Sequence, residues 1–127
     1  MPTRTSRYRI LLVDDDPDIT RVFKIGLEQK GFAVDAFTDP LGVSKTVKEG
    51  AYDLAVIDIQ MPDIDGFELY RLLRARDKRL KVVFLTAFEM RETEYGKLPQ
   101  DAMLKGLLKK PLTISQLAAE LKVRIEP

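Results

Sequence analysis

Polar side chains that could carry out chemistry together follow four short apolar runs of the sequence. In chain order these side chains are Asp14 with Asp15, Asp58, Thr86 and Lys110. Three neighbouring carboxylates repel one another and raise one another's pKa unless a cation lies among them. Because carboxylate oxygens are the ligands that Mg²⁺ prefers, the residue types favour a divalent-cation site. We interpret Asp58, a single carboxylate at the end of its run, as the reactive group of that site.

The composition excludes several other kinds of chemistry. The chain of 127 residues contains neither cysteine nor histidine. This excludes a disulfide framework, thiol catalysis, zinc sites built from cysteine and a histidine general base. A hydrophobic fraction of 45% at this length predicts one domain with a real core. The net charge of +1 indicates neither nucleic acid nor membrane as a partner, so we expect no direct binding to either. The sequence contains no apolar segment long enough to span a bilayer, and residues 1–9 lack the apolar core of a signal peptide, so we expect a cytoplasmic location.

Strand and helix signals alternate along the chain. Apolar runs predict strands at 10–13, 32–37, 52–58, 81–86 and 106–109. Helical spacing predicts a first helix that presents Ile19, Val22, Phe23 and Leu27 and ends at Gly31, and a third that presents Phe67, Leu69, Leu72 and Leu73. The alternation favours a mostly parallel sheet with helices on both faces. In such a sheet the carboxyl ends of all strands lie along one edge, so the polar side chains named above should converge there.

Helix starts are marked by capping signals. These are Asp16-Pro17, Asp39-Pro40, Asp65 with Glu68, and Thr113 with Gln116. A cap needs only one aspartate, so we assign that role to Asp16 and leave Asp14 and Asp15 for a metal. The second helix should reach about Glu49. The segment 89–105 is polar and Pro99 interrupts it, which predicts a short or irregular fourth helix.

The motifs at the strand ends resemble those of the receiver domain of two-component response regulators. The resemblance covers about residues 8–124 and rests on four matches in the family's order. They are Val13-Asp14-Asp15-Asp16, the phosphoacceptor motif D-x-x-M-P-x-x-D-G at 58–66, Thr86-Ala87 and Lys110-Pro111. It implies a flavodoxin-like, doubly wound α/β fold with five parallel strands in the order 2-1-3-4-5. The whole chain is then one receiver domain after a disordered tail at residues 1–7.

The resemblance also implies a role for each residue of the site. Asp58 would accept a phosphoryl group from a sensor histidine kinase or a phosphotransfer protein. Asp15 and Asp58 would ligate Mg²⁺, or alternatively Mn²⁺, together with the backbone carbonyl of Gln60, and Asp14 would act mostly through a metal-bound water. Lys110 and Thr86 would bind the phosphoryl oxygens, with Ala87 beside them. Lys109 is then a solvated neighbour, and Asp63 and Asp65 are structural.

Leu107 departs from the family pattern. Members often carry an aromatic residue three positions before the conserved lysine, and its ring turns inward when the threonine engages phosphate. Leucine has no ring or hydroxyl to offer, so we expect ordinary phosphorylation with an unusual readout toward an unknown downstream protein.

Three functions remain open. The first is a phosphorylatable signalling module without enzymatic turnover, either a stand-alone receiver or one excised from a longer regulator. The second is an Mg²⁺-dependent phosphohydrolase with an aspartyl nucleophile. Against it stand Gln60, where such enzymes carry a second aspartate, and the lack of a cap domain. The third is an interaction domain that does not depend on phosphorylation, and the intact set of site residues argues against it.

Overall fold

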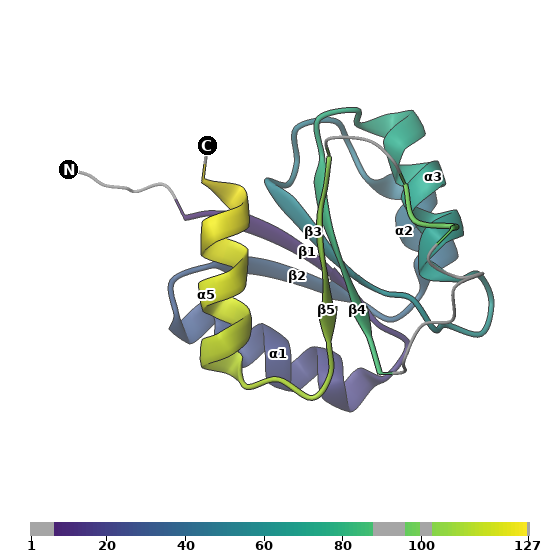
Figure 1. The fold of residues 1–127 in the computed structure, drawn as a ribbon. Coiled ribbons are helices and arrows are strands. Elements are labelled where there is room, and N and C mark those ends of the chain that lie inside the picture. The colour runs from purple at the N-terminus through teal and green to yellow at the C-terminus, as the bar shows by residue number, and fades with distance from the viewer. Residues whose placement is uncertain (1–6, 88–95, 100–102, 127) are drawn as a thin grey trace.

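A computed structural model of the chain describes residues 7–87, 96–99 and 103–126. Five strands form one parallel sheet in the order β2-β1-β3-β4-β5 (Figure 1). The strands are β1 (Arg9–Val13), β2 (Ala33–Phe37), β3 (Leu54–Asp58), β4 (Lys81–Thr86) and β5 (Leu104–Lys109). The helices are α1 (Pro17–Gln29), α2 (Pro40–Thr46), α3 (Gly66–Arg76) and α5 (Ile114–Ile125). The predicted fold class and strand order are confirmed.

The two faces of the sheet have separate cores. In β1 and β3, successive side chains point to opposite faces. Leu11, Ala55 and Ile57 belong to the core cluster beneath α2 and α3, whereas Ile10, Leu12 and Val56 belong to the cluster beneath α1 and α5. Figure 1 shows α1 and α5 side by side, apart from α2 and α3. All five residues of β3 are buried, as expected for a central strand covered on both faces.

Side-chain caps start three of the helices as predicted. Asp16 accepts hydrogen bonds from the backbone N–H groups of Asp18 and Ile19, and Asp65 accepts one from Glu68. Thr113 and Gln116 form a reciprocal capping box. Asp39 is an exception, because its side chain makes no capping hydrogen bond although Pro40 follows it.

The structure corrects five expectations. The third strand begins at Leu54, two residues after its predicted start at residue 52. The second helix ends at Thr46, not near Glu49, because Val47 is extended and its side chain is buried. The fifth strand begins at Leu104, two residues before the predicted start, and pairs with β4 through an irregularity between Val82 and Val83. Leu72 is 36% exposed and Val22 is 57% exposed, so neither is a core residue.

Two other predictions lie mostly outside the described residues. They are the tail at residues 1–7, of which the structure describes Arg7, and the fourth helix expected within 89–105. Within the described ranges, none of the helices is long and apolar enough to cross a bilayer.

Candidate functional site

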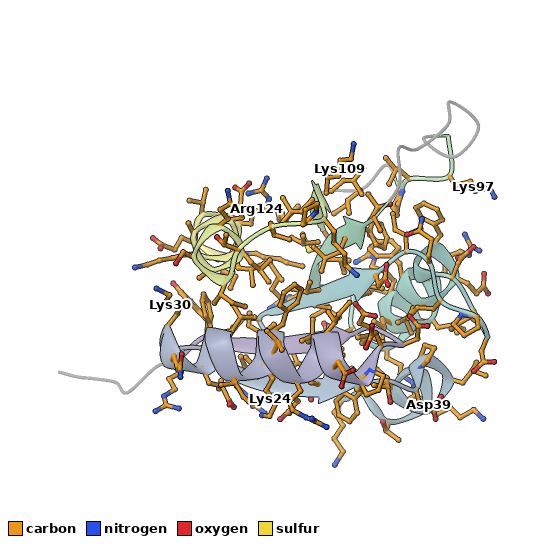
Figure 2. All side chains as sticks on the ribbon, turned by 90° about the horizontal axis from the view of Figure 1, so that it is seen from below. Lys24, Lys30, Asp39, Lys97, Lys109 and Arg124 are labelled. Atoms are coloured by element: carbon orange, nitrogen blue, oxygen red, sulfur yellow. The ribbon has the colours of Figure 1, made fainter. Side chains whose placement is uncertain are left out.

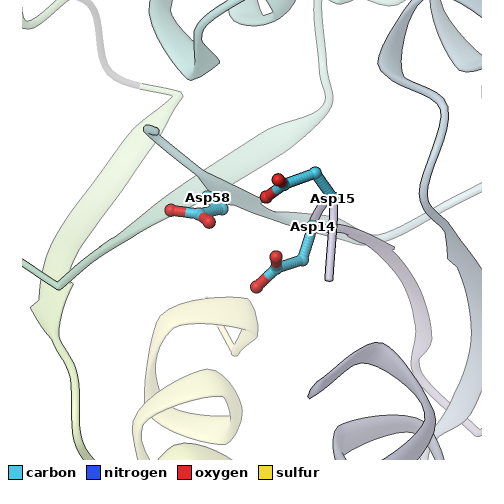
Figure 3. Close-up of side chains that lie close together, drawn as sticks. All are labelled: Asp14, Asp15 and Asp58. Atoms are coloured by element: carbon cyan, nitrogen blue, oxygen red, sulfur yellow. The ribbon is translucent and has the colours of Figure 1, made fainter. Parts of the chain in front are cut away.

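Three aspartates meet where β1 and β3 end. One carboxylate oxygen from each of Asp14, Asp15 and Asp58 lies within 4.8 Å of the others, and Figure 3 shows the three side chains around a common space. Asp14 and Asp58 are 1% and 6% exposed, whereas Asp15 is exposed. The cluster therefore has a buried floor and an open side through which an ion or a phosphoryl group can enter.

The turn between β1 and α1 holds Asp14 in the cluster. Its backbone N–H donates to the carbonyl of Phe37 over 3.2 Å. Its carboxylate Oδ1 accepts from the backbone N–H of Asp16 over 3.0 Å, while Asp16 in turn caps α1. Asp16 therefore caps the helix as predicted, and the carboxylates of Asp14 and Asp15 both lie in the cluster.

The loop after β3 holds Asp58. Its Oδ1 accepts from the backbone N–H of Gln60 over 3.2 Å, and the N–H of Gly66 donates to the carbonyl of Ile59 over 2.9 Å. A Cβ atom on Gly66 would lie 2.7 Å from the carbonyl oxygen of Asp58. Only glycine allows the start of α3 to approach the end of β3 so closely.

Lys110 supplies the one cation that the described residues bring to this cluster. Its Nζ lies 2.9 Å from Oδ2 of Asp14 and 3.5 Å from Oδ2 of Asp58. Its backbone N–H donates to the carbonyl of Thr86 over 2.7 Å, which ties the end of β5 to the end of β4. The peptide bond between Lys110 and Pro111 is cis. The sequence resemblance selected Lys110 over Lys109, and the geometry agrees, since Lys109 is exposed.

Burial and charge shift the acidities of this group of residues. Burial, followed by the charge of Asp14, raises the pKa of Asp58 to about 6, and Lys110 and the Gln60 N–H oppose this rise. Burial alone would lower the pKa of Lys110, but its hydrogen bond to Asp14 and the charges of Asp14 and Asp58 together raise it. An additional cation near Asp58 would stabilise its ionised form, which is the form that can act as a nucleophile.

Thr86 and Gln60 form a contact that the sequence did not indicate. Thr86 is 3% exposed at the end of β4, and its hydroxyl lies 3.4 Å from Oε1 of Gln60. Ala87 follows and is exposed. Leu107 is partly buried and packs against the core cluster beneath α2 and α3. No sequence signal could have placed the Gln60 side chain, because it depends on the path of the loop after β3.

The donor set fits a hard divalent cation. Carboxylate oxygens from two strand ends converge, one of them exposed, and the chain offers no histidine or cysteine to a softer metal. Burial and, after it, the charge of Asp14 raise the pKa of Asp58, and a cation bound among the carboxylates would oppose this rise.

An apolar groove adjoins the site. Its volume is about 540 Å³, and it lies between α1 and the segment that joins β5 to α5. Its lining residues are Asp18, Ile19, Val22, Phe23, Ala87, Lys110, Pro111 and Leu112. Sequence periodicity assigned Val22 to the core, but its side chain instead belongs to this surface groove. A partner seated here would lie directly beside Lys110.

Comparisons with known proteins agree on one family. Residues 10–122 match the family model described as response regulator receiver domain. The transcriptional regulatory protein QseB of Haemophilus influenzae is 34% identical over 117 residues, which are 92% of this chain and 52% of QseB. TrcR of Mycobacterium tuberculosis is 34% identical over 92% of this chain and 45% of its own length. The chain therefore spans about half the length of these curated relatives.

Solved structures give the same result. The response regulator TrrA of Thermotoga maritima, in complex with Mg²⁺ and BeF, is 28% identical with a TM-score of 0.75, over 92% of this chain and 98% of that one. TrrA in complex with the histidine kinase ThkA matches with a TM-score of 0.74 and 28% identity, over 94% of this chain and 99% of that one. A CheY-like receiver domain protein from Methanospirillum hungatei is 27% identical with a TM-score of 0.78, over 94% of each chain.

Proposed function

The chain belongs to the response regulator receiver domain family, and we propose that it is a switch that accepts a phosphoryl group on Asp58. The observation that carries this proposal is the convergence of three carboxylates with Lys110 at the ends of β1, β3 and β5. A nucleophile, a cation site and a fixed ammonium are what phosphoryl transfer to a carboxylate requires.

Asp58 is the nucleophile of the proposed reaction. One of its carboxylate oxygens forms a bond to phosphorus while the bond between phosphorus and an imidazole nitrogen of the donor breaks. The imidazole leaves with the electron pair and takes a proton from solvent. Lys110, 3.5 Å from Asp58, offsets the negative charge on the transferred group, and the Thr86 hydroxyl donates to one of its oxygens.

Asp14, Asp15 and Asp58, with the backbone carbonyl of Gln60, would hold Mg²⁺ or Mn²⁺. Asp15 would bind it directly and Asp14 mostly through water. A bound ion would supply positive charge that offsets the charge spread over the transferred group. The exposed carboxylate of Asp15 beside the two buried ones supports this assignment, as does the Mg²⁺ named with the Thermotoga relative.

The donor we propose is a sensor histidine kinase or a phosphotransfer protein. The chain contains no histidine, so it cannot supply its own phosphohistidine. The relative from Thermotoga is in complex with a histidine kinase. The groove beside Lys110 offers exposed apolar surface, including Val22 at 57% exposure, on which a donor could rest with its imidazole aimed at Asp58.

Phosphorylation would change the affinity of a partner surface rather than drive turnover, so we propose a signalling module that is not an enzyme and acts in the cytoplasm. The curated relatives are transcriptional regulators, and the output could pass to an attached domain or to a separate protein. The partner surface would exist in two conformations at equilibrium, and phosphorylation would change their populations.

Incubation with Mg²⁺ and acetyl phosphate, followed by intact-mass measurement, tests this function. We expect an adduct of one phosphoryl group that is absent with a chelator and absent in Asp58→Asn. Continuous hydrolysis of many phosphoesters would instead support the aspartyl phosphohydrolase. A chain that neither forms the adduct nor binds Mg²⁺ would be an interaction domain that does not depend on phosphorylation.

A further inference from the structure

A second groove, which we call the α1–α5 groove, lies between the end of α1 and helix α5, at the edge of the sheet opposite to the aspartates. Its volume is about 350 Å³, and sites for small molecules measure about 300–1,000 Å³. Figure 2 shows the separation of the two edges, because Lys30, just before β2, and Asp39, just after it, lie at opposite ends of the molecule. The groove is lined by Tyr8, Lys30, Gly31, Phe32, Ala118, Ala119 and Lys122.

Two aromatic rings give the groove an apolar wall. Phe32 is 5% exposed and belongs to the core cluster beneath α1 and α5, and Tyr8 packs against the same cluster. Helix α5 contributes Ala118 and Ala119 to the opposite side, and these small side chains leave the space open. Since aromatic rings pack well against other flat rings, the wall suits an aromatic group.

Backbone contacts hold this wall in place. The N–H of Ala33 donates to the carbonyl of Tyr8 over 2.9 Å, which joins the segments that carry the two rings. Gly31 has a φ of +100°, a conformation that ends α1 and leads the chain into β2. A groove that is formed before a ligand arrives costs little ordering on binding.

Two lysines supply positive charge to the groove, and its lining contains no carboxylate. Lys30 follows α1, Lys122 lies in the last turn of α5, and both are exposed. Among the described residues, neither has an ion-pair partner. Two ammonium groups beside one small groove repel each other, and an anion bound between them would remove this repulsion.

Stabilisation of helix ends explains only part of this arrangement. Cations near the end of a helix offset its dipole, but the carbonyls at the end of α1 already accept hydrogen bonds. The Leu27 carbonyl accepts from the N–H of Lys30 over 3.0 Å and of Phe32 over 3.2 Å. The Glu28 carbonyl accepts from the N–H of Gly31 over 3.1 Å. These carbonyls do not need the Lys30 ammonium, which stays free to bind a ligand.

We propose that the α1–α5 groove binds a small aromatic carboxylate. The ring would pack against Phe32 and Tyr8, and the carboxylate would accept charge-assisted hydrogen bonds from Lys30 and Lys122. A neutral aromatic molecule would leave the lysines without a counter-ion, and an inorganic anion would leave the apolar wall in water. This site goes beyond the proposed function, since it lies away from Asp58 and requires no phosphoryl chemistry.

Titration of the protein with naphthoate, followed by two-dimensional amide NMR spectra, tests the site. We expect chemical-shift changes centred on Gly31, Phe32 and Lys122 and a Kd below about 1 mM. Naphthol has the same rings without the carboxylate, so it should bind about tenfold more weakly or worse at about pH 7, and so should inorganic phosphate. Naphthoate binding should weaken as salt rises, because the lysines are exposed.

Two pairs of variants test the charge and the shape. Lys122→Glu should lower the affinity for naphthoate about tenfold or more, whereas Lys45→Glu, in the last turn of α2 and equally exposed, should leave it unchanged. Ala119→Phe should fill the groove and weaken binding, and Ala75→Phe, at an exposed alanine of α3, should not. Because all four positions are exposed, the variants should keep the thermal unfolding midpoint of the unaltered protein.

Several results would overturn the proposal. They are equal binding of naphthoate and naphthol, equal affinity in the two lysine variants, and no binding up to about 10 mM naphthoate. Shift changes centred on the groove beside Lys110 would place the ligand elsewhere, and tighter binding of phosphate would leave an adventitious anion site only. Asp58→Asn should bind naphthoate with the same Kd as the unaltered protein, so failure of the phosphorylation proposal would not change this result.

Discussion

The ammonium of Lys110 lies 2.9 Å from Oδ2 of Asp14, closer than its 3.5 Å distance to Oδ2 of Asp58. Lys110 therefore lies nearest to the most buried carboxylate of the cluster, and the charge of Asp58 is only partly compensated. Burial, followed by the charge of Asp14, raises the pKa of Asp58, and Lys110 at this distance offsets only part of the rise. A bound cation is then the natural means of ionising Asp58 fully at neutral pH.

Removal of the Lys110 ammonium should impair phosphoryl transfer. We expect Lys110→Met to reduce the rate of adduct formation from acetyl phosphate by about a hundredfold or more, because a fixed charge that stabilises the transition state is lost. Lys109→Met is the matched control, since Lys109 is adjacent in sequence but exposed. The rate of adduct formation is measured by intact mass over time. An equal loss of rate in both variants would contradict the role assigned to Lys110.

The stability of the metal-free protein should depend on the charge of Asp58. Its pKa of about 6 in the folded protein exceeds the ordinary value of 3.8, so the folded state binds the proton more tightly than the unfolded state. This contribution to stability is complete below about pH 4 and is lost as pH rises through about 6. Asparagine at position 58 carries no charge, so Asp58→Asn should not lose stability as the pH rises.

At about pH 8 we therefore expect Asp58→Asn to raise the free energy of unfolding by about 1–3 kcal/mol, measured by urea denaturation. The difference should shrink toward about pH 4. Asp63→Asn, an exposed aspartate in the following loop, serves as the control and should show no such pH dependence. A gain for Asp58→Asn that is constant with pH would show that ionisation is not its cause.

Mg²⁺ should stabilise the folded chain through Asp15. A ligand that binds only the folded state at about 100 times its Kd adds about 2.7 kcal/mol. The midpoint temperature of thermal unfolding should therefore rise when Mg²⁺ is added to the unaltered protein. It should rise equally in Asp18→Asn, which changes an exposed aspartate of α1. The rise should be absent or much smaller in Asp15→Asn. An unchanged response in that variant would place the ion elsewhere.

Position 66 should tolerate no side chain, because Gly66 lies so close to Asp58. In Gly66→Ala the new Cβ would meet backbone atoms of Asp58 and Ile59, and we expect a loss of about 1–3 kcal/mol in stability from overpacking. Gly42→Ala is the comparison, because the three atoms nearest to its new Cβ all belong to the exposed Asp39 side chain and none to the backbone. That variant should gain up to about 1 kcal/mol from helix propensity. Urea denaturation of both variants measures the contrast.

Leu107→Tyr tests the atypical readout. Leu107 packs against the core beside α2 and α3 and does not belong to the carboxylate cluster. We expect its replacement by tyrosine to leave the rate of labelling by acetyl phosphate unchanged within about twofold, since the charges around Asp58 are the same. Lost or greatly slowed labelling would mean that this position takes part in the chemistry.

The sequence predicted the features that rest on local signals. Neighbouring residues decide where β1, β3 and β4 end. They also decide the caps by Asp16 and Asp65 and the capping box of α5. Once the strands are parallel, topology alone brings their carboxyl ends together. This is why Asp14, Asp58 and Lys110 could be grouped before any coordinates were known.

Features that depend on tertiary packing were missed. Burial of Val47 ends α2 early, and pairing with β4 extends β5 back to Leu104. Val22 fits the helical period but faces a surface groove, because periodicity does not say how wide the buried stripe of a helix is. The preference of Lys110 for Asp14 over Asp58 likewise depends on distances that no spacing in the sequence encodes.

Above all, we propose that Asp58 carries the phosphoryl group. Borohydride reduces an aspartyl phosphate to homoserine, so mass-spectrometric mapping of the protein after acetyl phosphate, Mg²⁺ and borohydride locates the modified residue. We predict homoserine at position 58, and none in a sample treated with chelator. Homoserine at Asp14 or Asp15 instead, or a phosphoryl group recovered on a serine or threonine, would contradict the claim.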